Sequence, residues 1–185
     1  MAKIKLYHGT SQESYNSILE HGFDSGRFND MVWNCSDDDY TYFYNPLNFI
    51  ESGECDDMES AQNMCIERAF ENARIGASVQ KSKAESMFVV CVEVELSDVE
   101  SDDSCDNMEL SCKVESSKIS AESIIEVYES DFIYTASLLY IAGLMNNDWI
   151  ILDNFSQAEL NLMRTLAKDD YYDDDLYYIE YEQVK

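Results

Sequence analysis

The first 23 residues contain the feature that most restricts the fold, because they read as a strand, a turn and a short helix in immediate succession. Ile4, Leu6 and Tyr7 form the short apolar run that is typical of a strand. Gly9 permits a backbone bend that a residue with a Cβ would resist, so we expect the chain to turn there. His8 would then lie at the end of the strand.

A helix is expected to begin directly after this turn. Thr10 and Glu13 have the spacing of a capping box, in which each side chain bonds the backbone amide of the other residue. Three apolar residues then share one helical face, namely Tyr15, Ile18 and Leu19. Gly22 is expected to end the helix, with Phe23 folding back on it. His8 would therefore lie beside a helix N-terminus, whose free amides favour anionic or carbonyl ligands.

The segment Tyr7-His8-Gly9-Thr10, the helix after it and the Gly22-Phe23 ending resemble the opening of the ADP-ribosyltransferase fold. The similarity is to the branch that includes poly-ADP-ribose polymerases, diphtheria-like toxins and DNA-ADP-ribosylating toxins. In that branch the histidine hydrogen-bonds the adenine ribose of NAD, and the glycine backbone holds the nicotinamide carboxamide. The resemblance therefore implies that His8, Gly9 and Thr10 bind NAD. A histidine beside a glycine at a strand end can also be purely structural.

The resemblance also implies a second motif, in which a strand leads to an aromatic residue and a small hydroxyl residue. Residues 31–35 are expected to form that strand. Ser36 would bond the nicotinamide carboxamide and Tyr42 would stack on the nicotinamide ring. Trp33 and Tyr44 remain alternatives to Tyr42, because the spacing differs from the polymerase pattern. These rings could also simply fill a core beneath a loop.

Two longer segments are expected to form the centre of the domain. Residues 57–75 carry apolar and small residues at helical spacing, which predicts a helix that packs closely through alanines. Residues 87–96 begin as a continuous apolar run and end in alternation. This pattern predicts a central strand that emerges toward solvent at its end.

Residues 108–114 and 119–128 predict two further strands after an acidic loop. In the DNA-modifying members of the family, the catalytic glutamate opens a strand of similar shape. The resemblance therefore implies that Glu109 is the catalytic residue, with Glu115 as the alternative. In so acidic a chain, either carboxylate could also be solvated surface.

The last third of the chain has no clear counterpart in the minimal transferase fold. The expected elements are an apolar helix at 132–146, a buried segment at 149–152, a helix opened by a Ser156/Glu159 capping box, and a final strand at 176–184. We therefore divide the chain into a core at residues 1–130 and an extension at residues 131–185, within one globular unit.

The formal net charge of -26 on 185 residues restricts the partners. Such a field repels nucleic acid, anionic membrane and polyphosphate, and attracts basic protein surfaces. We therefore expect a basic protein partner and no direct binding to nucleic acid or membrane. Five aspartates within residues 169–175 are interleaved with tyrosines, either as an adhesive acidic surface or as a solvated turn.

The cysteines predict neither a metal site nor a disulfide framework. The six are Cys35, Cys55, Cys65, Cys91, Cys105 and Cys112. They form no CxxC pair, and no histidine lies at zinc-finger spacing from them. The N-terminus lacks a basic and apolar leader, and the apolar run at residues 132–144 is shorter than the ~20 residues that span a bilayer. The chain is therefore expected in the cytoplasm, or in the host cytoplasm if it is viral.

These observations predict an α+β fold with a mixed, mainly antiparallel sheet that is split around a cleft and covered by helices. The resemblance implies an NAD-dependent mono-ADP-ribosyltransferase that acts on a protein acceptor. A second hypothesis is an inactive, highly acidic decoy that mimics DNA and blocks a nucleic-acid-binding defence enzyme, like proteins that bacterial viruses use. A third is a sensor of NAD or ADP-ribose without turnover.

Overall fold

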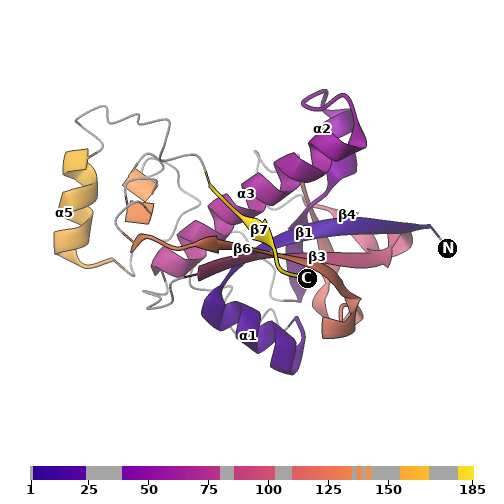
Figure 1. The fold of residues 1–185 in the computed structure, drawn as a ribbon, viewed down its shortest axis with the longest axis horizontal. Helices are drawn as coiled ribbons and strands as arrows, with labels where there is room; N and C mark the ends of the chain where they lie inside the picture. Colours follow the sequence, from indigo (N-terminus) through magenta and orange to yellow (C-terminus); the bar gives the residue numbers. More distant parts are fainter. Residues whose placement is uncertain are drawn as a thin grey trace.

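The computed structural model describes most of the chain, as Figure 1 shows. The described residues are 2–23, 39–79, 86–102, 110–134, 137–138, 141–142, 155–166 and 179–185. The expected strand at 31–35, the buried segment at 149–152 and the aspartates of 169–175 lie outside these ranges.

Within the described residues, seven strands form one sheet in the order β4-β5-β2-β1-β3-β6-β7. Their bounds are β1 Lys3–Ser11, β2 Tyr40–Tyr44, β3 Ser86–Glu95, β4 Val99–Ser101, β5 Ser111–Glu115, β6 Ile124–Asp131 and β7 Glu182–Gln183. Every neighbouring pair among these described strands is antiparallel, so the expected parallel component is not found here. With the helices, the sheet confirms the α+β class.

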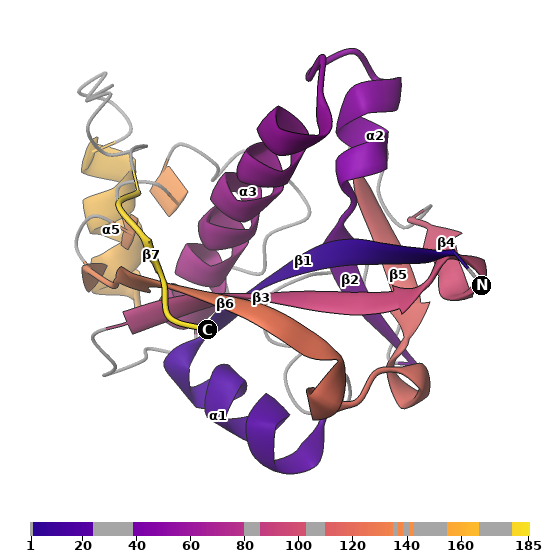
Figure 2. The ribbon, with the colours of Figure 1, turned by 45° about the vertical axis from the view of Figure 1, so that its right-hand side comes forward.

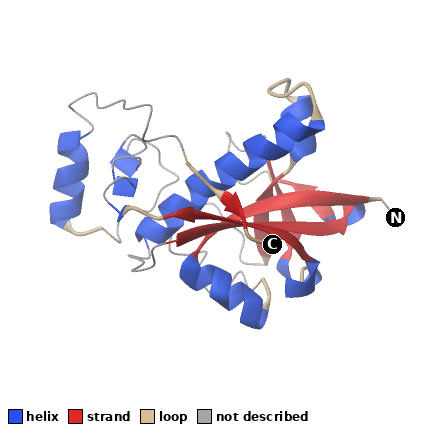
Figure 3. Cartoon of the chain, viewed as in Figure 1, coloured by secondary structure: helices blue, strands red, loops and turns tan. Residues whose placement is uncertain are grey.

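The helices cover the sheet on both faces, with α1 and α3 on opposite sides (Figures 1 and 3). Their bounds are α1 Gln12–His21, α2 Pro46–Glu51, α3 Met58–Val79 and α5 Gln157–Leu166, and Tyr134, Ser137, Leu138, Ile141 and Ala142 are also helical. Within the described residues, no helix is long and apolar enough to cross a membrane.

Side-chain alternation along the central strands produces two separate cores. Because successive side chains point to opposite faces, Leu6 packs on the α1 side and Tyr7 on the α3 side. The strand expected at 87–96 is β3, which is paired with β1 on one edge and β6 on the other. A third core joins the end of α3 to the C-terminal helices through Ile75, Leu138, Ile141, Ala142, Phe155 and Met163.

Among the described strands, β1 and β2 share the shortest ladder. β1 pairs with β3 at nine positions, whereas its described pairing with β2 is the single pair Tyr7 and Tyr44. The described strands therefore form one sheet rather than two separate ones. Within the described strands, the ladder partners of His8, Gly9 and Thr10 lie on the β3 side.

The N-terminal segment differs from the sequence prediction in two respects. β1 does not turn at Gly9 but stays extended to Ser11, because pairing with β3 continues to Met87. The expected Thr10 and Glu13 capping box is wrong, since Thr10 belongs to the strand. Ser11 caps α1 instead, and its Oγ accepts a hydrogen bond from the Ser14 amide at 3.2 Å. His8 therefore lies inside β1.

The expected helix ends agree better with the structure. Gly22 ends α1 with a φ of 78°, and its amide donates to the Ile18 carbonyl at 2.9 Å. The capping box at Ser156 and Glu159 is confirmed: the Ser156 amide donates to Glu159 Oε2 at 2.6 Å and the Glu159 amide to Ser156 Oγ at 3.3 Å. Both are local signals, and the tertiary structure does not override them.

Gly9 is required because α3 lies directly on β1 at this point. A Cβ on Gly9 would lie 1.6 Å from the Ala69 carbonyl oxygen and 2.5 Å from its carbon. Ala69 belongs to a row of buried small residues on α3, made up of Ala61, Cys65, Ala69, Ala73 and Ala77. The glycine thus provides a close helix-to-strand contact rather than the expected bend.

Replacing Gly9 or Gly76 by alanine should have opposite effects on stability, because only the Cβ added at Gly9 meets the backbone of α3. Gly9→Ala should destabilise the protein by about 3 kcal/mol, because a backbone carbonyl cannot move aside as a flexible side chain can. Gly76→Ala is the matched control, since it lies in α3 with no atom within 4 Å of its added Cβ. It should stabilise the helix by about 0.5 to 1 kcal/mol. Urea denaturation of both variants tests this, and a Gly9→Ala protein of wild-type stability would contradict it.

Candidate functional site

The His8 side chain connects β1 to β2 just beyond Tyr7, where the two strands separate. Its Nδ1 lies 2.8 Å from the Tyr42 carbonyl oxygen, across 34 residues of sequence. A carbonyl oxygen can only accept, so Nδ1 carries the proton and donates it. In the neutral ring, Nε2 is then left with a lone pair as a hydrogen-bond acceptor.

Two phenylalanines hold the His8 ring in place. The imidazole centroid lies 6.0 Å from that of Phe23 and 5.6 Å from that of Phe43, and the two phenyl rings are 5.9 Å apart. Phe23 reaches this position because Gly22 reverses the chain at the end of α1. The turn after α1 thus returns a ring to the histidine, in line with the expected fold-back of Phe23.

Burial lowers the pKa of His8 below its ordinary value of 6.5, and the Tyr42 carbonyl opposes this shift more weakly. The ring is therefore neutral at neutral pH. A neutral imidazole that donates through Nδ1 presents only an acceptor to a ligand. The side chain is thus suited to a hydroxyl or an amide N–H rather than to an anion.

The backbone beside His8 offers a second kind of contact. Within residues 8–10, the N–H and C=O groups of alternate residues of β1 face the β2 side. The described part of β2 pairs with β1 only at Tyr7, so it supplies no ladder partner for these groups. A ligand with an adjacent donor and acceptor could pair with them as another strand would.

The other residues expected to bind NAD do not all lie beside the His8 ring. Tyr42 contributes its carbonyl, but its ring alternates with Phe43 and so lies on the face opposite to the His8 ring. Thr10 is buried in β1, opposite Phe88 of β3. Ser36 lies outside the described residues.

The two alternatives to Tyr42 are also not beside the histidine ring. Tyr44 points toward α3, where its hydroxyl accepts a hydrogen bond from Asn72 Nδ2 at 3.1 Å. Burial raises the Tyr44 pKa, so this phenol stays protonated. Trp33 lies outside the described residues.

Glu109 lies outside the described residues, but the start of β5 is well defined. Ser111 pairs with Tyr44, which in turn pairs with Tyr7, so these three residues form one row across the sheet. Two strand spacings amount to about 10 Å. The Leu110 carbonyl accepts from the Asn45 amide at 3.3 Å, which ties the approach to β5 to the start of α2.

Glu115, the alternative to Glu109, lies at the far end of β5. A hydrogen bond from Ser117 and then the nearby Lys118 lower the pKa of its carboxyl. The Lys118 ammonium lies 3.5 Å from the carboxylate. This carboxylate therefore takes part in a local surface contact at the opposite end of the strand from Ser111.

Sequence reasoning missed Phe43 and the Tyr42 carbonyl. The alternation within Tyr40-Thr41-Tyr42-Phe43-Tyr44 was a usable signal, because Phe43 is the ring in that run without a hydroxyl and is therefore suited to the core. The role of the Tyr42 carbonyl depends on how β1 and β2 meet, which no local pattern specifies.

No metal centre is seen in the described part of the chain, where no three His, Cys, Asp or Glu side chains gather as ligands. Four buried cysteines there are free thiols, namely Cys55, Cys65, Cys91 and Cys112. Burial raises the pKa of Cys91 and of Cys112 to about 12, so neither thiol is activated as a nucleophile.

Comparisons of the chain with protein-family models, with curated proteins and with solved structures gave no match. Function must therefore be inferred from the chemistry of this site.

The His8 environment predicts a defined pH dependence. Because the folded-state pKa lies below 6.5, the unfolded chain binds the proton more tightly, and this part of the stability is lost as the pH falls below 6.5. His8→Gln removes the titrating group and keeps a donor. The stability advantage of the wild type over His8→Gln should therefore shrink on acidification in urea denaturation.

An NMR titration of the histidine rings provides the direct check. The signal that disappears in His8→Gln should titrate below 6.5 in the native protein. A titration midpoint at or above that value would contradict the neutral ring.

Proposed function

We propose that the protein is an NAD-dependent mono-ADP-ribosyltransferase that modifies a basic protein acceptor. The observation that carries the proposal is the neutral His8 acceptor beside a β1 segment with no described ladder partner on the β2 side. The resemblance of residues 4–23 to the transferase opening supports it.

The backbone of Gly9 would recognise the nicotinamide carboxamide. A primary amide presents one acceptor and two donors, and it can pair with the N–H and C=O of one extended residue. Because α3 lies on Gly9 at the position of a Cβ, the substrate would approach from the β2 side. Ser36 would supply a further hydroxyl to the same carboxamide.

His8 would recognise the adenine ribose. Its Nε2 can accept a hydrogen bond from a ribose hydroxyl, and Phe23 and Phe43 fix the direction in which that lone pair points. Thr10 and Tyr42 complete the proposed binding set. The ring of Tyr42 would have to reach the nicotinamide from the opposite face of β2.

Glu109 would act at the nicotinamide ribose. Its carboxylate would accept a hydrogen bond from the 2′-hydroxyl and so stabilise the positive charge that develops as the glycosidic bond breaks. The remaining contribution is positioning, since the substrate carries its own leaving group. Ser111, at the start of β5, lies in the same row across the sheet as Tyr7. This placement supports the assignment, because Tyr7 precedes His8 in β1.

The diphosphate of NAD is anionic, and the net negative charge of this chain opposes its binding. Several described cations already face carboxylates, in the pairs Lys3–Glu93, Lys5–Glu126, Arg68–Glu71 and Lys118–Asp98. Arg68 is thus engaged by Glu71 at 3.1 Å. Arg27 lies outside the described residues. Backbone amides are then the expected phosphate donors.

Titration calorimetry with NAD tests the binding site. The wild type should bind NAD, and His8→Ala should weaken binding by about 1 to 2 kcal/mol, the range for losing one well-placed hydrogen bond. His21→Ala is the matched control, since that histidine is exposed on α1. A folded wild-type protein that does not bind NAD would remove the enzyme proposal.

Nicotinamide release, followed in parallel, separates turnover from binding. Glu109→Gln should retain NAD binding and lose release, whereas Glu59→Gln, an exposed glutamate in the first turn of α3, should retain both. Release that survives in Glu109→Gln would remove the catalytic assignment. Binding without release in the wild type would indicate a sensor of NAD or ADP-ribose.

The charge distribution favours a second candidate function, the acidic decoy. The ion pairs above neutralise several of the twelve lysines and arginines locally, while most of the 38 acidic residues have no cation to balance them. A surface of this sign can compete with nucleic acid for a basic protein. In that case the transferase-like site would be a remnant or a scaffold.

Ionic strength distinguishes the two candidates. Association with a basic partner should be fast at low salt and slow markedly as salt rises, because the Debye length is about 8 Å at physiological ionic strength. Replacing the five aspartates within residues 169–175 by asparagine should slow that association. The same variant should keep any nicotinamide release. A partner whose association rate does not depend on salt would contradict the decoy.

A further inference from the structure

The C-terminal residues 179–185 run along the edge of the sheet beside β6 (Figure 2). The Val184 amide donates to the Val127 carbonyl at 2.8 Å, and Ser130 Oγ donates to the Glu180 carbonyl at 2.6 Å. Ile179 is buried in the same core as Tyr7. The segment is therefore attached by backbone bonds and by an apolar anchor, and we refer to it as the C-terminal clasp.

Tyr181 of the clasp fills the space between α3 and β6. Its ring stacks on Phe70 of α3, with centroids 5.4 Å apart and an interplanar angle of 30°. It also meets Tyr128 of β6 edge to face, at 5.9 Å and 87°. One side chain thus connects the helix to the strand.

The contact with Phe70 lies one residue away from the contact that Gly9 makes. Ala69 precedes Phe70 in α3, and its carbonyl occupies the position where a Cβ on Gly9 would be. Any movement of α3 at Phe70 therefore changes the contact on Gly9. The interaction between the clasp and α3 is in this way transmitted to β1.

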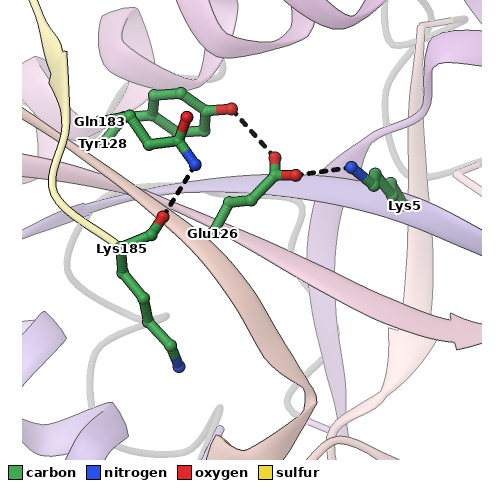
Figure 4. Close-up of polar contacts among 5 residues, drawn as sticks. All are labelled: Lys5, Glu126, Tyr128, Gln183 and Lys185. Atoms are coloured by element: carbon green, nitrogen blue, oxygen red, sulfur yellow. Dashed lines mark hydrogen bonds and ion pairs between the residues drawn. The ribbon is translucent and has the colours of Figure 1, made fainter.

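Polar contacts continue from Tyr128 of β6 through Glu126 to Lys5 of β1, as Figure 4 shows. Tyr128, which meets the Tyr181 ring, donates from its hydroxyl to Glu126 Oε2 at 2.9 Å. Glu126 Oε1 accepts from Lys5 Nζ of β1 at 2.5 Å. Glu126 is 21% exposed, so solvent screens this pair less than a surface pair.

The end of the clasp is fixed to the other end of β6. Lys185 Nζ donates to the Ile124 carbonyl at 2.8 Å. Gln183 Nε2 donates to the Lys185 carbonyl at 2.9 Å, as Figure 4 shows. The clasp is thus bound along most of β6, and these bonds fix the position of Tyr181 relative to that strand.

From these contacts we propose that Tyr181 is a positioning residue for the site at His8 and Gly9, and that it acts by holding α3 on β1. Within the described residues, β1 and β2 share one residue pair, so the position of β1 depends mainly on α3 and on β3 with the strands beyond it. The inference rests on the proposed function, because it concerns NAD affinity. It adds a role for the C-terminal extension.

Three substitutions test the proposal by NAD titration. Tyr181→Ala should weaken NAD binding by about tenfold, a coupling of ordinary size between connected sites. Tyr181→Phe keeps both ring contacts and should bind within about twofold of the wild type. Tyr134→Ala is the matched control, since that tyrosine is also partly buried against the same core but packs beside Phe132 and Glu159. It should lower stability without lowering affinity.

Amide exchange without ligand gives a second measure that does not depend on the proposed function. Residues 8–11 should exchange faster in Tyr181→Ala than in Tyr134→Ala at matched stability. If Tyr181→Ala fails to fold, Tyr181→Leu keeps an apolar side chain and should show the same two effects.

The outcomes are separable. A wild-type protein that binds no NAD removes the proposed function, and amide exchange alone then decides the role of the clasp. Unchanged NAD affinity in Tyr181→Ala, or equal exchange at residues 8–11 in both alanine variants, would overturn the proposal. A tenfold loss of NAD affinity in Tyr181→Ala, together with near wild-type affinity in Tyr181→Phe, would support it.

Discussion

The close approach of α3 to β1 at Gly9 is the contact on which the rest of the structure depends. Because the Ala69 carbonyl takes the place of a Cβ, the helix lies nearer to the strand than any other residue would allow. This proximity brings Tyr7 and the buried alanines of α3 into one core. It also leaves the neighbouring His8 to face the opposite core, where Phe23 and Phe43 surround it.

Local signals predicted the elements whose ends depend on local hydrogen bonds, and they failed where strand pairing decides. Gly22 and the Ser156/Glu159 box lie at helix ends that satisfy their own amides and carbonyls, so the sequence identifies them. The Thr10 box had equally good spacing. It does not form, because pairing of β1 with β3 extends to Ser11 and keeps Thr10 in the sheet. The contact of His8 with the Tyr42 carbonyl could not be predicted for a related reason, since it requires the geometry of two strands 34 residues apart.

The chemistry of the site and the charge of the chain point in different directions. The described contacts around His8 are a backbone carbonyl and two phenyl rings, so this part of the protein presents no charge to a ligand. The chain as a whole carries -26. A neutral site in a negative field favours ligands through hydroxyl, amide and ring groups, and penalises phosphates. A dinucleotide would therefore be held mainly by its two ends.

The contacts that form the site also determine when it can assemble. Tyr7 meets Tyr44, Lys5 meets Glu126 across 121 residues, and the clasp returns from the end of the chain to Phe70 of α3. Contacts of such sequence separation form late, since the chain must first close long loops. The position of β1 therefore depends on contacts with segments that lie far from it in the sequence, namely β3, β6 and the clasp. The extension at residues 131–185 is therefore part of the structure that supports His8, although its sequence has no counterpart in the motif that pointed to that histidine.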